Sequence, residues 1–241
     1  MTELNAAAPK RGMFGAALAG GIIGALIASA LLIVALPGVL SSRIVRQGLL
    51  ADPKILSDAV DALRDAQYQP VLAEHRAEIE TPFGSSWKGA AKPDVTLVEF
   101  FDYACPYCKA SNPSVDRLLR EDKGLRVVYR ELPILGPDSV VAARLSLEAS
   151  KAGRFAQFHD TLWATGRPSP QTIAVAAKAA GIATQPTSDP TIETELKRNF
   201  QLAGQLGATG TPLFVVGDRV MNSAVPYETL KEAISHARAK R

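Results

Sequence analysis

Both cysteines of this chain fall within one stretch, FFDYACPYC at residues 100–108, where two residues separate them. The run at residues 95–101 is rich in β-branched and aromatic residues, which is typical of a buried strand. After Cys108, apolar side chains recur at helical spacing as far as Leu119, so a strand passes into a helix here. Pro106 suits the first turn of that helix, where its missing N–H costs no hydrogen bond.

The spacing of the two cysteines predicts redox chemistry. Cys105 falls at the helix N-terminus, where unpaired N–H groups and the helix dipole favour a thiolate. Cys108 lies on the same helix face, close enough to close a disulfide. We therefore expect an exposed, acidic sulfur at Cys105 and a shielded sulfur at Cys108, as thiol–disulfide exchange requires.

Two other roles are open to a pair of cysteines at this spacing. A structural zinc site needs four ligands, and His75, His159 and His236 lie far apart in the sequence without ligand spacing. We therefore predict no metal site. An inert disulfide that closes so short a loop contributes little stability through chain entropy.

Composition limits the class of protein further. The 241 residues are 47% hydrophobic and 21% charged, which is enough for one sizeable domain with accessory segments. The net charge is only +3, and the chain has no run rich in Lys and Arg, so nucleic-acid binding is not supported. Two cysteines provide no disulfide framework, and both are committed to one site.

The N-terminal region predicts a membrane anchor. Residues 12–42 contain no charged side chain and are long enough to span a bilayer as a helix. We expect an uncleaved transmembrane anchor there, with residues 1–11 in the cytoplasm. A cleaved secretory signal is the alternative, because residues 28–30 read Ala-Ser-Ala. Basic residues flank both ends of the span, so the orientation rests on the chemistry expected downstream.

Residues 43–80 predict a helical stalk that Pro70 breaks or kinks. This amphipathic stretch docks either on the main domain or on copies of itself, and small residues along the membrane span are a second possible self-association face. Residues 81–93 predict a linker or a short edge strand. A homo-oligomer formed through the stalk or the transmembrane helix therefore remains open.

The rest of the chain returns to strand after a long helical stretch. A second strand is expected at residues 125–132, followed by helices at 139–152, 155–165, 171–180 and 191–206. A strand at 213–216, a turn at Gly217 and Asp218 and a final helix from Pro226 complete the chain. His159 and Trp163 share one helix face and are expected to be packing residues.

This order resembles that of the DsbA-like thiol–disulfide oxidoreductases, in which a helical domain is inserted into a thioredoxin fold. The motifs EFFDYACPYC at 99–108 and GATGTPLFV at 207–215 carry the resemblance, which covers about residues 93–238. It implies an α/β fold with a thioredoxin domain at 81–138 and 208–241 and a helical insertion at 139–207. The stalk is similar to that of the membrane-anchored, Com1/ScsC-like branch.

The resemblance also implies a role for each matching residue. Cys105 matches the attacking cysteine and Cys108 the resolving one. Pro212 matches the cis-proline that faces the active-site disulfide, and Thr211 presents its backbone to an extended substrate. Glu99 matches a carboxyl group that handles protons for the buried cysteine. The alternative is that Glu99 is a strand residue that faces solvent, and we favour the role that the resemblance implies.

Two departures from DsbA concern the direction of the reaction. The residues between the cysteines are Pro106 and Tyr107, where DsbA has Pro-His, and a neutral Tyr107 cannot stabilise a thiolate by charge. Thr211 before the proline is typical of isomerases and reductases of this fold. We expect both intervening residues to support the site, but they leave the direction of electron flow open.

The sequence thus predicts an enzyme of a bacterial inner membrane with its catalytic domain on the periplasmic side. Its expected activity is disulfide donation, and isomerase or reductase activity is the alternative. Its partners would be reduced or misoxidised client proteins and a membrane redox partner for recycling. The Cys105–Cys108 disulfide would be its redox centre, with no other cofactor. A hypothesis of another class is a non-catalytic, membrane-tethered assembly module whose dithiol binds a metal.

Overall fold

The computed structural model describes residues 44–240, and the chain divides into two units between Asp61 and Ala62. The described part of the first unit holds a helix over residues 44–51 and the start of helix α2 (Lys54–Glu80). The predicted cytoplasmic N-terminus and transmembrane anchor, residues 1–42, lie outside the described residues. Within residues 44–240, no helix combines the length and the apolar character needed to cross a membrane.

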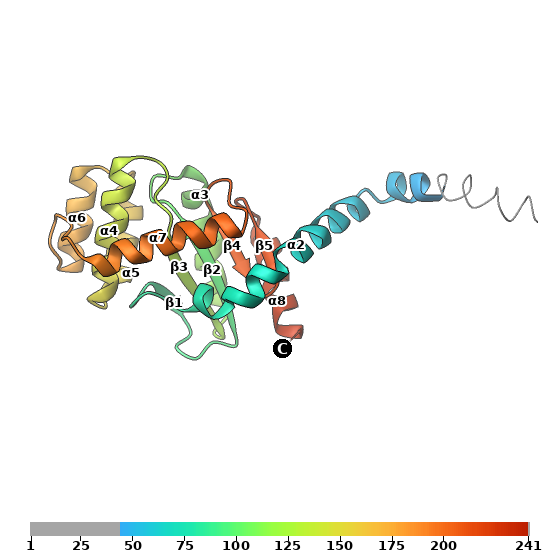
Figure 1. The fold of residues 1–241 in the computed structure, drawn as a ribbon, viewed down its shortest axis with the longest axis horizontal. Coiled ribbons are helices and arrows are strands. Elements are labelled where there is room, and N and C mark those ends of the chain that lie inside the picture. Colours follow the sequence, from blue (N-terminus) through green and yellow to red (C-terminus); the bar gives the residue numbers. More distant parts are fainter. Residues whose placement is uncertain (1–43, 241) are drawn as a thin grey trace, which may run out of the picture. The chain divides into compact units, whose positions relative to one another are not determined.

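The second unit is built around a mixed sheet with the strand order β1-β3-β2-β4-β5 (Figure 1). Strands β2 and β3 are parallel and are joined by helix α3 (Pro106–Glu121), which confirms the predicted strand–helix–strand unit. The other pairings are antiparallel. The strands are β1 (Trp87–Gly89), β2 (Val95–Phe101), β3 (Leu125–Glu131), β4 (Leu213–Val216) and β5 (Arg219–Met221).

Alternate residues of β2 belong to two different apolar cores, one on each face of the sheet. Leu97 and Phe101 pack in the core that includes residues of α3 and of the C-terminal helix α8 (Tyr227–Ala239). Val98 and Phe100 pack in the core that includes residues of α2 and α7. This two-residue period is that of a strand buried on both faces. All seven residues of β2 are buried, so a polar side chain on it lies inside the domain.

Four helices lie between β3 and β4, in agreement with the predicted helical stretch. Each predicted boundary falls within two residues of the observed one. A capping box between Ser169 and Thr172 starts the third of these helices, and the Asp189 side chain caps the fourth. The helices are α4 (Pro137–Lys151), α5 (Phe155–Thr165), α6 (Pro170–Ala180) and α7 (Pro190–Gln205).

A break or a kink was predicted at Pro70; helix α2 continues through this proline, so the break is wrong. A proline inside a helix costs about 3 kcal/mol, because it removes a hydrogen bond and clashes with the preceding turn. Leu72 and Ile79 lie beyond Pro70, and both are buried in the core against the sheet and α7. Their burial offsets the cost of the proline. The end of the predicted stalk is therefore part of the core of the second unit.

Arg130 of β3 fixes the end of α2 to the sheet and to α7. This side chain is buried and donates hydrogen bonds to the carbonyl oxygens of Ile79 and Thr81, both at 2.9 Å. It also donates to Glu195 at 3.0 Å and to Asn199 at 2.7 Å. A buried guanidinium is tolerated when its charge and its donors are matched in this way.

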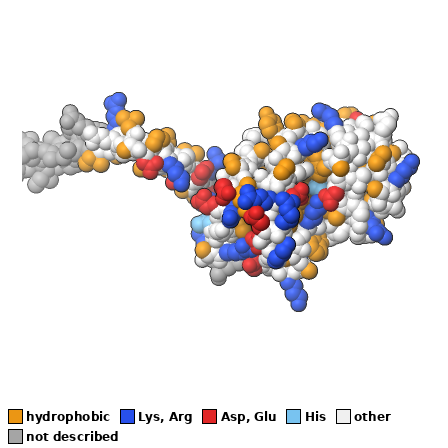
Figure 2. All heavy atoms as spheres, turned by 180° about the vertical axis from the view of Figure 1, so that it is seen from behind, with side chains coloured by type: hydrophobic (Ala, Val, Ile, Leu, Met, Phe, Trp, Pro, Cys, Tyr) orange, Lys and Arg blue, Asp and Glu red, His pale blue; other side chains and the backbone are white. Residues whose placement is uncertain are grey.

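Charged side chains of both signs are intermixed on the face of the molecule shown in Figure 2. The ion pairs of the second unit include a contact of 2.7 Å between Arg238 and Asp94 and one of 2.8 Å between Arg117 and Glu121. Because such exposed pairs are well solvated, each contributes about 0–1 kcal/mol to folding. The second unit therefore rests on its apolar cores and on the buried contacts of Arg130.

Candidate active site

Cys105 is the N-cap residue of α3, as the sequence predicted. Its backbone is extended (φ −79°, ψ 119°), Pro106 follows at the start of the helix, and no side chain caps the helix N-terminus. The first N–H groups of α3 therefore remain available near the sulfur. Cys105 is buried, however, with 4% of its surface exposed, so the prediction of an exposed sulfur is wrong.

The loop before β4 covers Cys105. The thiol of Cys105 donates a hydrogen bond to the carbonyl oxygen of Thr211, with a sulfur–oxygen distance of 3.1 Å. The peptide bond between Thr211 and Pro212 is cis, and this confirms the geometry implied by the resemblance. Residues more than a hundred positions apart in the chain thus meet at one sulfur, and their contact explains why Cys105 is buried.

Cys108 lies one helical turn further on and is completely buried. Burial is the main reason why the pKa of its thiol is raised far above the ordinary range, and the nearby Glu99 carboxyl raises it further. Both cysteines are present as free thiols. A proton on Cys108 therefore needs an acceptor inside the protein before this sulfur can act as a nucleophile.

Glu99 is buried within β2, at 1% exposure, so the alternative of a strand residue that faces solvent is wrong. Loss of solvation raises the pKa of this carboxyl to about 8. The positive charge of Lys88 lowers this pKa and the negative charge of Asp116 raises it. Its Oε2 atom has no hydrogen-bond partner among the described residues. Glu99 is therefore a buried acid that can change its protonation state near neutral pH.

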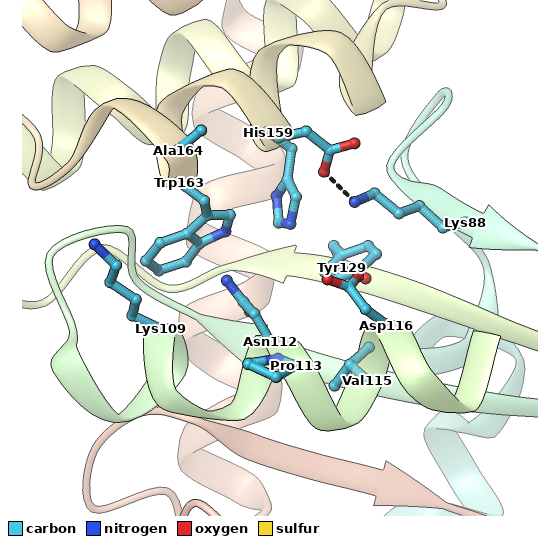
Figure 3. Close-up of a pocket in the computed structure, with 11 residues that line it drawn as sticks. Lys88, Lys109, Asn112, Pro113, Val115, Asp116, Tyr129, His159, Trp163 and Ala164 are labelled. Carbon is cyan, nitrogen blue, oxygen red and sulfur yellow. Dashed lines mark hydrogen bonds and ion pairs between the residues drawn. The ribbon is translucent and has the colours of Figure 1, made fainter. Parts of the chain in front are cut away.

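A cavity of about 330 Å³ lies between α3, α5 and the edge of the sheet (Figure 3). Lys88 and Asp116, whose charges act on Glu99, both line it, as does Tyr129, the register partner of Glu99 on β3. Lys88 forms an ion pair with Asp160 at its edge. The cavity thus lies next to the groups that act on Glu99 and is lined by polar side chains that can hold water.

His159 and Trp163 of α5 are packing residues, as expected. His159 is buried among the rings of Phe101, Tyr103 and Tyr129, with ring centroids 4.6–5.5 Å apart. Its Nδ1 atom lies 3.0 Å from the hydroxyl of Tyr103. Burial holds the pKa of His159 well below its ordinary value, so its imidazole stays neutral.

Sequence reasoning did not single out Asp102, which lies between β2 and the cysteines. Its carboxylate is buried and accepts hydrogen bonds from the backbone N–H groups of Ala104, Ile134 and Leu135. The sequence nevertheless contains a signal for the hydrogen bond between Asp102 and the Ala104 N–H. An aspartate that directly follows an apolar strand often binds the N–H group two residues further on.

Comparison with known proteins agrees with this geometry. A model of the DSBA-like thioredoxin domain family matches residues 96–235, which is more than half of the chain. The chain therefore belongs to this family. It is a DsbA-like thiol–disulfide oxidoreductase, as the resemblance implied.

Three curated relatives differ in how much of their own length this chain covers. The Na(+)/H(+) antiporter NhaA 1 of Salinispora arenicola is 29% identical over 157 residues, which are 62% of this chain but only 24% of the antiporter. A second Salinispora antiporter, from Salinispora tropica, is covered over 12% of its length. Disulfide bond formation protein D of Bacillus subtilis is 25% identical over 195 residues, 74% of this chain and 81% of that protein.

Solved structures show the same fold. A periplasmic thioredoxin-like protein from Salmonella enterica serovar Typhimurium is 31% identical, with a TM-score of 0.62 over 68% of this chain and 95% of that one. A linker-deletion variant of ScsC from Proteus mirabilis is 28% identical, with a TM-score of 0.66 over 86% of this chain and 97% of that one. The similarity to ScsC thus extends beyond the matched domain.

Proposed function

We propose that this enzyme donates the Cys105–Cys108 disulfide to extracytoplasmic client proteins. The observation that carries the proposal is the position of the Cys105 sulfur at the N-terminus of α3, next to the cis peptide bond between Thr211 and Pro212. A helix N-terminus attracts negative charge, which favours the reduced form of a dithiol whose reactive sulfur lies there. A stabilised reduced form makes the disulfide a stronger oxidant.

The proposed reaction has two exchange steps. A client thiolate attacks the Cys105 sulfur, a client–enzyme disulfide forms, and the Cys105–Cys108 bond breaks. Cys108 leaves as a thiolate and takes up a proton. A second client thiolate then attacks the client sulfur of the mixed disulfide and releases Cys105 as a thiolate. The client loses two electrons, the enzyme gains them, and a membrane redox partner would remove them again.

Glu99 is proposed to handle the proton of Cys108. It is the buried carboxyl whose charge raises the pKa of that thiol, and its own pKa of about 8 suits proton exchange near neutral pH. The cavity lined by Lys88 and Asp116 offers water a place next to the charges that act on this carboxyl (Figure 3). Pro106 and Tyr107 would support the site by starting the helix between the two sulfurs.

Two residues favour the isomerase or reductase direction as a second candidate. Tyr107 is 66% exposed and carries no charge that could stabilise the Cys105 thiolate. Thr211 is the residue whose carbonyl oxygen contacts Cys105, and threonine here is typical of isomerases and reductases of this fold. The same cysteines would then attack a wrong client disulfide, and a reductant would regenerate the dithiol.

The location and assembly of the protein are part of the proposal. The apolar residues 12–42 would anchor it in a bacterial inner membrane, with residues 1–11 in the cytoplasm and the catalytic domain in the periplasm. The periplasmic Salmonella protein, which is similar to this chain, supports that side of the membrane. Exposed apolar residues of the stalk, such as Leu56 and Leu63, would suit a homo-oligomer.

The test compares two assays of the full chain. Oxidised enzyme is mixed with a reduced, unfolded protein that needs disulfides, and reduced enzyme is mixed with the same protein in scrambled form. We expect the first reaction to be fast and to vanish in both Cys105→Ser and Cys108→Ser, because neither variant can form the Cys105–Cys108 disulfide. Reduced Cys108→Ser should instead accumulate a mixed disulfide with the scrambled protein, because Cys105 attacks a client disulfide and no Cys108 thiol is present to resolve the product. Activity in the scrambled assay alone would contradict disulfide donation. No turnover in either assay, together with metal binding to the dithiol, would support the assembly module instead.

A further inference from the structure

Gly207 lies between the end of α7 and β4, directly against the ring of Tyr68 on α2. Its φ angle is +69°, and a Cβ atom at this position would overlap the Tyr68 hydroxyl oxygen and lie 2.9 Å from the Tyr68 Cζ atom. Glycine is the residue that suits both the left-handed backbone and so close a neighbour. Helix α2 therefore makes a close contact with the segment that leads to the active site.

That segment ends over the reactive sulfur. Residues 207–212 form the Thr211 loop, which connects α7 to β4. The carbonyl oxygen of Thr211 accepts the hydrogen bond from the Cys105 thiol at 3.1 Å. Leu206 before the loop and Leu213 after it are completely buried in the core on the α2 face of the sheet. The loop is thus fixed at both ends, and the stretch between these ends covers Cys105.

Helix α2 is itself held in place at this contact. The Tyr68 side chain is half-buried and packs against the same core, and Leu72 of the next turn is buried in it. About two turns beyond Tyr68, Arg76 donates hydrogen bonds to the carbonyl oxygen of Gly217 at 2.7 Å and to the Asp218 carboxylate at 2.8 Å, in the turn after β4. Helix α2 thus contacts the chain on both sides of β4, so its tyrosine ring is a fixed neighbour of the loop.

We propose that Tyr68 is a positioning residue whose ring supports the Thr211 loop over Cys105 and thereby sets how readily this sulfur becomes accessible. The inference rests on the proposed function only in taking Cys105 as the reactive sulfur. A buried thiol reacts when the structure around it opens locally, and the free energy of that opening depends on the contacts that hold the covering segment. The predicted stalk, which contains Tyr68, takes part in the active site through this contact.

Alkylation of Cys105 by iodoacetamide measures the opening. The full chain carries Cys108→Ser, so that Cys105 is its only thiol, and the Cys105 thiolate displaces iodide to form a thioether. The reaction is followed by intact mass at fixed pH without denaturant. Tyr68→Ala should raise the rate at least about threefold, because the loop loses a packed contact and opens more often. Tyr68→Phe keeps the ring against the loop and should keep the rate of the parent protein.

Gly207→Ala tests the same contact from the loop. The added Cβ atom forces either the tyrosine ring or the loop to move, and either movement removes the contact. We expect a rise in the alkylation rate similar to that of Tyr68→Ala. The matched control is Gly153→Ala, where φ is +72° and the added Cβ atom meets no other part of the described chain within 4 Å. This control has the same backbone strain without the contact, so it should keep the parent rate.

The double variant Tyr68→Ala/Gly207→Ala shows whether the two residues act through one contact. Once the ring is absent, the added Cβ atom has no ring to displace. The combined rise in rate should therefore be about that of either single variant, because residues that share a contact are not additive. A combined rise equal to the product of the two single effects would overturn the inference.

Trp87→Ala controls for a general loss of stability. Trp87 packs against the same core as Tyr68, but from β1, which is separated from β4 by β3 and β2. This variant should lower the free energy of unfolding in urea and leave the alkylation rate unchanged. If it raises the rate as much as Tyr68→Ala does, the rate reports general stability and the positioning role is wrong.

The remaining outcomes separate this inference from the proposed function. An unchanged alkylation rate in Tyr68→Ala would overturn the inference, because the ring would then only pack against the core. Client oxidation by the enzyme with both cysteines would still support disulfide donation in that case. If Tyr68→Ala is alkylated faster but the enzyme oxidises no client, the positioning role stands and the proposed function is wrong.

Discussion

Glu99 and Asp102 are three residues apart on the same strand and the turn that follows it, and both are 1% exposed, yet their surroundings differ. Three backbone N–H groups bind the Asp102 carboxylate. By contrast, Glu99 Oε2 has no hydrogen-bond partner in the described part of the chain, and the pKa of Glu99 is raised to about 8. Burial alone therefore does not assign a role to a carboxyl group. A buried carboxylate that accepts hydrogen bonds from several N–H groups stabilises the loops around it. A buried carboxyl without such donors keeps a raised pKa and can exchange a proton near neutral pH.

The largest expected difference between the two residues is in the pH dependence of stability. Folded Glu99 keeps a proton that an unfolded chain releases near pH 4.5, so stability should fall as pH rises from 4.5 through about 8. The loss amounts to about 5 kcal/mol at most. Glu99→Gln cannot lose this proton, so its stability advantage over the wild type should grow as pH rises above 4.5 and be largest above about pH 8. Urea unfolding of the reduced proteins at pH 5, 7 and 9 measures this. If the free energies of unfolding of the wild type and Glu99→Gln differ by the same amount at all three pH values, this prediction is wrong.

Asp102→Asn should change stability in the opposite direction. Loss of acceptors for buried N–H groups costs about 1–3 kcal/mol for each group left unpaired. The variant should therefore be less stable than the wild type at pH 7 and pH 9, whereas Glu99→Gln should be more stable. The same urea series compares the two directly. If both substitutions stabilise the protein, the contrast between the two carboxyls is wrong.

The next effect is kinetic and concerns only Glu99. When Cys108 attacks a mixed disulfide at Cys105, its proton must leave, and a positioned base accelerates that transfer. We expect Glu99→Gln to slow decay of the mixed disulfide at least about tenfold at neutral pH. The inflection of the wild-type pH profile near pH 8 should disappear as well. Single-turnover quenching with a thiol-blocking reagent follows this step, and an unchanged profile in the variant would remove Glu99 from it.

The smallest expected effects come from the two charges beside Glu99. Lys88 lowers the pKa of Glu99 and Asp116 raises it. Lys88→Met should therefore shift the inflection of the mixed-disulfide decay to higher pH, and Asp116→Asn should shift it to lower pH. Both residues line the cavity at α3, away from the cysteines. Shifts in the same direction would show that the inflection does not belong to Glu99.

The sequence predicted the features of this site that depend on local pattern. The apolar run before the cysteines predicted β2, and Pro106 predicted the start of α3. The resemblance placed Thr211 and Pro212 beside the disulfide, but local pattern could not show that this loop buries Cys105, because that contact joins distant segments. For the same reason the sequence predicted a break or a kink at Pro70 and could not show that burial of Leu72 against the sheet keeps α2 continuous there.

Asp102 is a second residue whose contacts the local sequence pattern predicts only in part. Its place after a strand predicts a local bond to the Ala104 N–H, but not the bonds to Ile134 and Leu135. Those bonds depend on the parallel pairing of β2 and β3, which brings residues more than thirty positions apart to one edge. The roles of Glu99 and Asp102 could therefore be separated only once the fold was known.

The reduction potential of the Cys105–Cys108 pair tests disulfide donation most directly. The full chain is equilibrated with glutathione buffers, and the fraction of dithiol is measured at each ratio of reduced to oxidised glutathione. We predict a potential in the range of strong protein oxidants, about −120 mV. A potential of about −200 mV or lower would contradict disulfide donation and favour isomerase or reductase activity.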